Sequence, residues 1–313
     1  MHPAWSVILL TTLIGVGQGL FAALVAVQAL ELVPPGAAFY RFGAALAFAF
    51  LAAGLIASFF HLGRPERAWR TAAMWRTSWL SREVVVLPAF MACVVAYGLG
   101  HALGWPASGP LGTLAIGTLG IVLCAALFVC TGMIYACLRF LQEWHSPLTI
   151  VNYALFGCAS GLMLATGFAA LVEPALVRPL AAWAAGLTLA VLATRTASLV
   201  RNARLKPKST LQTAIGVKHP RIVQTSQGFM GGSFNTREFF HGAPQGLVRS
   251  IRWTFLVAVF PVPLALLAAG LAWQAPVLLV AAFLVQYGGL LAERWFFFAQ
   301  ANHPQNLYYQ RIS

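Results

Sequence analysis

Long apolar runs constrain the fold of this chain more than any other feature. An α-helix needs about 20 apolar residues to cross the hydrocarbon core of a bilayer. Prolines such as Pro34, Pro147 and Pro276 stand at the junctions between runs, where helices stop or start. The runs cover roughly residues 5–31, 39–60, 83–103, 112–140, 150–172, 178–200, 251–273 and 276–300. The sequence therefore predicts an all-α polytopic membrane protein, an eight-transmembrane-helix bundle forming a single membrane domain over residues 1–313.

The first run also bears on targeting. It extends from Trp5 to Leu32 without a basic segment before it. A cleavable signal peptide has a shorter apolar core and a basic start. We therefore expect the first run to remain as a membrane span.

The basic residues predict the orientation of the bundle. The chain has 20 Lys and Arg against 7 Asp and Glu, a formal net charge of +13, and 18 of the basic residues fall on one side. Only Arg41 and Arg178 fall on the other. Because basic loops stay inside, we expect both termini in the cytoplasm of a bacterium and the bundle in its inner membrane. Anionic lipid headgroups explain this charge, and no nucleic-acid partner is expected.

Two segments on the basic side are prominent. Residues 61–82 form a cytoplasmic arginine-rich loop, and residues 201–250 form a long cytoplasmic loop. A connection of this second length is uncommon unless it has a function. Its aromatic and glycine-rich end favours docking onto another protein, and a flexible connector is the alternative. The opposite face has only short, nearly uncharged connections.

Polar residues beside the arginine-rich loop are the candidate site. Glu83 opens the third predicted span, where it could exchange protons with a quinone. Alternatively, its charge complements the helix dipole, and Ser81 caps the helix. His61 ends the second span and could donate to a quinone carbonyl, or it could simply cap the helix. Arg64 and Arg67 could hold Glu83, polarise a carbonyl or bind a lipid phosphate.

Further polar residues lie inside the apolar runs. Gln18 stands among three glycines in the first span. Helix packing is the simpler interpretation of this group, and contact with a ligand headgroup is the other. Glu293 and Arg294 are expected to form an ion pair that faces the bundle interior.

The sequence does not predict a metal centre in this chain. The five cysteines fall inside apolar runs without a C-x-x-C pair, so an iron–sulfur cluster is not expected here. The seven histidines fall in loops or at span ends, which argues against a bis-histidine haem. We therefore predict no metal ligands and no haem.

Three motifs resemble those of a known protein family. HLGRPERA at 61–68, TSWLSRE at 77–83 and AERWFFFAQANHPQNLYY at 292–309 resemble the membrane anchor subunit of dimethyl sulfoxide reductase and its relatives, the complex iron–sulfur molybdoenzymes. The segment 218–242 resembles the branch that anchors cytoplasmic, quinone-dependent sulfite dehydrogenases. The resemblance covers essentially the whole chain.

The resemblance implies a heterotrimer with two partners on the cytoplasmic side. A molybdopterin subunit would catalyse the substrate reaction, and a ferredoxin-like subunit would hold the iron–sulfur clusters. The anchor would bind ubiquinone or menaquinone, with His61, Arg67 and Glu83 matching the family residues linked to the quinol site. Arg82 departs from the pattern and could pair with Glu83, which would make the carboxylate a poorer base.

The predicted function is therefore that of a quinone-binding anchor, which is not catalytic toward the substrate by itself. Sulfite oxidation coupled to quinone reduction is the first expectation. The first alternative is a quinol-oxidising anchor of a dimethyl sulfoxide reductase-type enzyme. A small-molecule transporter is the alternative of another class, although the paired broken helices and midplane charges of transporters are not evident.

Overall fold

The computed structural model describes residues 1–34, 37–104, 109–226 and 238–309. Within these residues, eight helical segments are long and apolar enough to cross a membrane, which confirms the predicted fold class. Six of them are single helices, with the bounds α1 (Trp5–Ala29), α2 (Ala38–Phe59), α3 (Trp79–Ala102), α4 (Gly109–Ala136), α5 (Pro147–Val172) and α11 (Pro276–Ala299). The sixth span joins a 3₁₀ turn, η2 (Pro174–Leu176), to α6 (Val177–Ala203).

The seventh span consists of two helices, α9 (Gln245–Val259) and α10 (Pro261–Ala272). They meet at Phe260, whose ψ of −80° departs from helical values. Pro261 follows it and has no N–H to donate, so the helix breaks there. The expected single helix over 251–273 is thus wrong in its continuity, and it also begins six residues earlier than expected.

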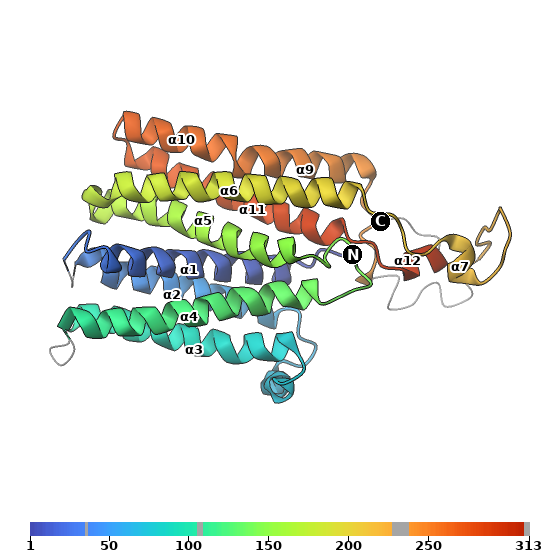
Figure 1. Cartoon of the computed structure of the whole chain (residues 1–313), viewed down its shortest axis with the longest axis horizontal. Helices are drawn as coiled ribbons and strands as arrows, with labels where there is room; N and C mark the ends of the chain where they lie inside the picture. The colour runs from blue at the N-terminus through green and yellow to red at the C-terminus, as the bar shows by residue number, and fades with distance from the viewer. Residues whose placement is uncertain (35–36, 105–108, 227–237, 310–313) are drawn as a thin grey trace.

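The helices lie side by side along one direction, and the described ends of the chain lie at the same end of the bundle (Figure 1). We call this the terminal end. It also carries the loops after α2, α4 and α6, together with the short helices α7 (Leu211–Ile215) and α12 (Gln305–Tyr308). Which face of the membrane it occupies stays a prediction from the charge distribution.

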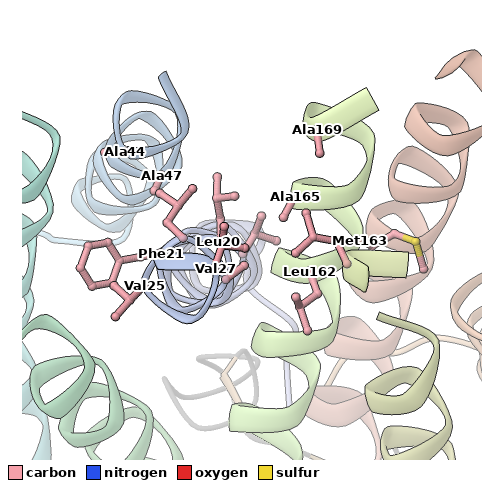
Figure 2. Close-up of a cluster of buried hydrophobic side chains, with 14 of the residues drawn as sticks. Leu20, Phe21, Val25, Val27, Ala44, Ala47, Leu162, Met163, Ala165 and Ala169 are labelled. Atoms are coloured by element: carbon pink, nitrogen blue, oxygen red, sulfur yellow. The ribbon is translucent and has the colours of Figure 1, made fainter. Parts of the chain in front are cut away.

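The core is built around α1 and α5, which are the most buried spans. Figure 2 shows α1 between α2 and α5, with Leu20 and Val27 of α1 among the side chains of the apolar cluster. Gly19 and Gly161 allow the two helices to cross closely, because a Cβ on Gly161 would collide with the backbone of Gly19. Small residues at such a crossing bring helices into van der Waals contact in a membrane.

The first predicted loop is described throughout, and the second is described only in part. The first contains a 3₁₀ helix, η1 (Pro65–Met74), which packs against α3 (Figure 1). In the second, α6 continues to Ala203 and α9 begins at Gln245, so the connection is shorter than 201–250. Residues 227–237, which include most of the predicted aromatic and glycine-rich segment, lie outside the described residues.

Candidate functional site

Glu83 lies one turn inside α3 rather than at its start. The helix begins at Trp79, and the Ser78 hydroxyl accepts a hydrogen bond of 3.4 Å from the Ser81 N–H. The expectation that Ser81 caps a helix opening at Glu83 is therefore wrong. The earlier start turns the Glu83 side chain into the bundle, where only 7% of the residue is exposed.

The Glu83 carboxylate is bonded inside the bundle. Its Oε1 accepts a short hydrogen bond from the Thr131 hydroxyl of α4. Beside this pair is a small internal space, here called the glutamate cavity, with a volume of about 10 Å³, enough for about one water molecule. Its polar lining comes from α1, α3, α4, α5 and α11: Thr11, Thr12, Gln18, Glu83, Thr131, Tyr153 and Arg294.

Gln18 lines the same cavity, so the structure brings two of the predicted site residues together. Its amide donates a 3.0 Å hydrogen bond to the Cys124 carbonyl of α4. This bond ties α1 to α4 and is a packing role. Contact of Gln18 with a ligand stays a prediction.

The other three predicted residues lie elsewhere. His61, Arg64 and Arg67 are exposed, and none of them lines the glutamate cavity. The Arg67 Nε lies 3.9 Å from Glu66 Oε1 in an exposed pair, so Arg67 does not hold Glu83. The His61 pKa is lowered because its surroundings partly desolvate the ring, which favours the neutral imidazole.

Arg82 does not pair with Glu83 either. Its guanidinium donates hydrogen bonds of 2.9 Å and 2.8 Å to the carbonyls of Trp75 and Arg76. It also lies over the Trp79 ring, 4.2 Å from the centroid. Neighbours on a helix point in different directions, so Arg82 closes the arginine-rich loop while Glu83 faces inward. The expected weakening of Glu83 as a base by Arg82 is therefore absent.

A buried ionic cluster lies behind Glu83. Glu293 of α11 contacts Arg195 of α6 at 2.8 Å and Arg294 at 3.1 Å. Glu293, Arg195 and Arg294 are only 1%, 2% and 3% exposed, respectively. The predicted Glu293–Arg294 pair is confirmed, and Arg195, which lies inside the predicted span 178–200, joins it as a third member. A charge within a membrane helix is costly and usually functional, a signal that the sequence already carried.

The ionic cluster borders a second internal space, here called the arginine cavity, also of about 10 Å³. It shares Tyr153 and Arg294 with the glutamate cavity. The Arg294 guanidinium lies over the Tyr153 ring, 3.8 Å from its centroid. The two cavities are therefore adjacent, separated by these two side chains.

A larger hollow opens at the terminal end. This outer cleft has a volume of about 620 Å³ and is bordered by the turn after α4, the segment after α6 and the C-terminal segment. It shares Glu143 and Asn202 with the arginine cavity. Arg201 closes the boundary by donating to the carbonyls of Gln142 at 3.1 Å and His145 at 2.9 Å.

Metal-binding side chains are scattered in this chain. The described residues contain no group of three or more His, Cys, Asp or Glu side chains that could hold a metal ion. The five cysteines are free thiols. Proton exchange and hydrogen bonding are the chemistry that the polar groups around Glu83 can support.

These features define a polytopic membrane protein with ionisable groups buried near one end of its bundle. The family model described as DMSO reductase anchor subunit (DmsC) matches residues 1–299. A protein of Allochromatium vinosum, named as the C subunit of sulfite dehydrogenase, is 55% identical over 327 aligned positions, which cover all of both chains. The chain therefore belongs to the DMSO reductase anchor subunit family, and it is a membrane anchor subunit.

Proposed function

We propose that this chain is the quinone-reactive anchor of a heterotrimeric molybdopterin oxidoreductase. It would pass electrons between the quinone pool and iron–sulfur clusters of a ferredoxin-like partner that docks at the terminal end. The observation that supports this most is Glu83, a carboxylate buried at membrane depth behind an arginine-rich loop. Buried ionisable groups in membrane helices are usually functional.

The site must accommodate the quinone ring, and the glutamate cavity is too small for it, because ligand pockets usually exceed about 300 Å³. The exposed donors His61, Arg64 and Arg67 lie in the loop that joins α2 to α3. We place the ring at this loop. The neutral His61 imidazole donates to a ring oxygen, the arginines hold the loop and the ring, and Glu83 exchanges protons from the inner side of α3. The bound quinone supplies the two-electron chemistry.

We infer the direction of electron flow from the names of the relatives. The name of the Allochromatium vinosum protein favours sulfite oxidation with quinone reduction. The family description favours the reverse direction as a second candidate, in which quinol is oxidised and dimethyl sulfoxide is reduced. The terminal end would be cytoplasmic in both cases, with the molybdopterin subunit attached through the iron–sulfur subunit.

The test is purification of the complex in a mild detergent, followed by metal and quinone analysis and turnover assays. We expect molybdenum, iron and quinone to co-purify, with sulfite-dependent quinone reduction. Dimethyl sulfoxide reduction by quinol would favour the second candidate. A chain that purifies alone, without molybdenum or iron, would contradict both.

Glu83→Gln tests the residue that supports the proposal. Because the amide cannot exchange protons, we expect quinone-coupled turnover to fall at least about tenfold. Turnover with an artificial acceptor at the catalytic subunit should stay unchanged. Glu31→Gln is the matched control, since Glu31 is exposed just after α1, at the end of the bundle opposite the terminal end. Equal quinone turnover in the wild type, Glu83→Gln and the control variant would mean that the chain is only a structural anchor.

A further inference from the structure

Three hollows follow one another from the terminal end of the bundle to Glu83. The outer cleft and the arginine cavity share Glu143 and Asn202. The arginine cavity and the glutamate cavity share Tyr153 and Arg294. Adjacent hollows that share lining side chains form a series in which only those side chains separate one hollow from the next, and we call this series the polar passage.

The walls of the polar passage contain several buried hydrogen-bonding side chains from different helices. Asn152 of α5 donates to the Ser198 hydroxyl of α6 at 2.8 Å and accepts from the Thr194 hydroxyl at 2.8 Å. Thr131 donates to Glu83 at the inner end. Polar groups buried among apolar helices are costly unless they are bonded, so their concentration along one line indicates a function.

Two donors in the polar passage are left without protein partners. The Nε atoms of Arg195 and Arg294 are buried and have no hydrogen-bond partner among the described residues. Buried donors of this kind usually bond to internal water. Each cavity has about 10 Å³, enough for about one water molecule. The passage can therefore hold a short chain of water molecules and hydroxyl groups.

We propose that the polar passage carries protons between the terminal end and Glu83. This inference rests on the proposed function. Reduction of a quinone to a quinol takes up two electrons, supplied by the iron–sulfur clusters of the partner, and two protons. Glu83 gives one proton to a reduced quinone oxygen, regains a proton through the passage, gives this second proton to the other oxygen, and is then reprotonated through the passage. In quinol oxidation the same steps run in reverse.

The ionic cluster supports this transfer by its charge. Arg195 and Arg294 contribute two positive charges, and Glu293 contributes one negative charge. The cluster therefore carries a net positive charge beside the cavity that Glu83 lines. We expect this charge to favour the Glu83 anion that remains after proton transfer. Glu293 is held between two guanidinium groups, so water and hydroxyl groups of the passage are the proton carriers in this proposal.

The first test measures water in the passage without any turnover. Radiolytic hydroxyl-radical labelling of the purified complex modifies buried side chains that adjoin internal water. Tyr153 and Tyr40 are both buried. Tyr153 borders the passage, whereas the Tyr40 hydroxyl lies away from it and donates to the Val33 carbonyl at 3.1 Å. We expect Tyr153 to be labelled severalfold faster than Tyr40. Equal labelling of the two tyrosines would overturn the proposal.

The second test interrupts the passage at two places. Asn152→Leu fills the arginine cavity with an apolar side chain of similar size, and Thr131→Val removes the hydroxyl at Glu83. We expect each to lower quinone-coupled turnover about tenfold and to raise its solvent deuterium isotope effect. Asn152→Leu should also slow the labelling of Tyr153. Thr166→Val is the matched control, since Thr166 is buried in α5 and bonds only to its own helix.

The outcomes separate the passage from the proposed function. A wild-type complex that neither reduces nor oxidises quinone would refute the proposed function itself. A quinone-active wild type with unaffected Asn152→Leu and Thr131→Val variants would refute only the passage. If Asn152→Leu does not assemble, Thr131→Val and the labelling of the wild-type tyrosines decide the question.

Discussion

The buried ionic cluster allows a prediction whose sign depends on which charge is removed. Glu293→Gln leaves Arg195 and Arg294 facing each other without a counter-charge. Arg195→Gln leaves the neutral pair of Glu293 and Arg294, which are 3.1 Å apart. The first change should therefore be much more destabilising than the second, although each removes one ionised group.

The distances give the size of the effect. At an effective dielectric constant of about 20, contacts of 2.8 Å and 3.1 Å correspond to roughly 6 and roughly 5 kcal/mol of attraction. Glu293→Gln loses both contacts, whereas Arg195→Gln loses only the first. Breaking a buried pair by removing one partner typically costs about 3–5 kcal/mol. We expect the destabilisation by Glu293→Gln to reach the upper end of that range. The double variant, which combines Glu293→Gln with Arg195→Gln, should recover part of the lost stability.

The assay is heating of the detergent-solubilised complex, with the chain fused to a fluorescent protein and detected by size-exclusion chromatography. The transition temperature should fall most in Glu293→Gln, less in the double variant and least in Arg195→Gln. Glu66→Gln is the control, because its exposed pair should contribute about 0–1 kcal/mol. A transition temperature of Glu293→Gln equal to or above that of Arg195→Gln would refute the charge argument.

Two further predictions concern packing and pH. Gly161→Ala should destabilise the bundle by about 1–3 kcal/mol or more, because the new methyl group meets the Gly19 backbone. Gly186→Ala is the control and should leave the stability unchanged, because its methyl group meets no atom within 4 Å. The same chromatographic assay compares the two variants. Partial burial lowers the pKa of His303, whose ring stacks on Phe239 at 3.8 Å. The unfolded chain then binds the proton more readily, so stability is complete above about pH 6.5 and falls as the pH drops toward the lowered value. His303→Asn should flatten this decline, which transition temperatures measured across that pH range would show, while equal slopes in variant and wild type would contradict it.

The spans could be predicted well from the sequence because apolar length is a strong and local signal. The direction that each side chain takes around its helix could be predicted less well. The predicted start of α3 is four residues late, since the cap at Ser78 lies in a stretch with two further candidate serines or threonines nearby. That error puts Glu83 at a helix end beside Arg82, whereas the true helix turns the carboxylate toward Thr131.

The candidate site separates into exposed loop residues and a buried carboxylate for a related reason. His61, Arg64, Arg67 and Glu83 are near one another in sequence, and proximity in sequence suggests one site. The carboxylate belongs to the bundle interior, however, with groups from α1, α4, α5 and α11. The roles of Arg195, Asn152 and Tyr153 depend on which helix faces meet, so the sequence does not predict them. Of these three, only Arg195 has a sequence signal, as a charge inside an apolar run.

The central position of α1 has a consequence for biogenesis. The first span to leave the ribosome is the one that later elements enclose. The Gln18 amide bonds to the carbonyl of Cys124, 106 residues further along the chain, so at about 5–20 residues per second α1 waits roughly 5–20 s for its partner. During that interval its glutamines face lipid or the insertion machinery. The bundle is thus completed late, when the later helices pack around α1. If they fail to pack, α1 is the span that loses its enclosure.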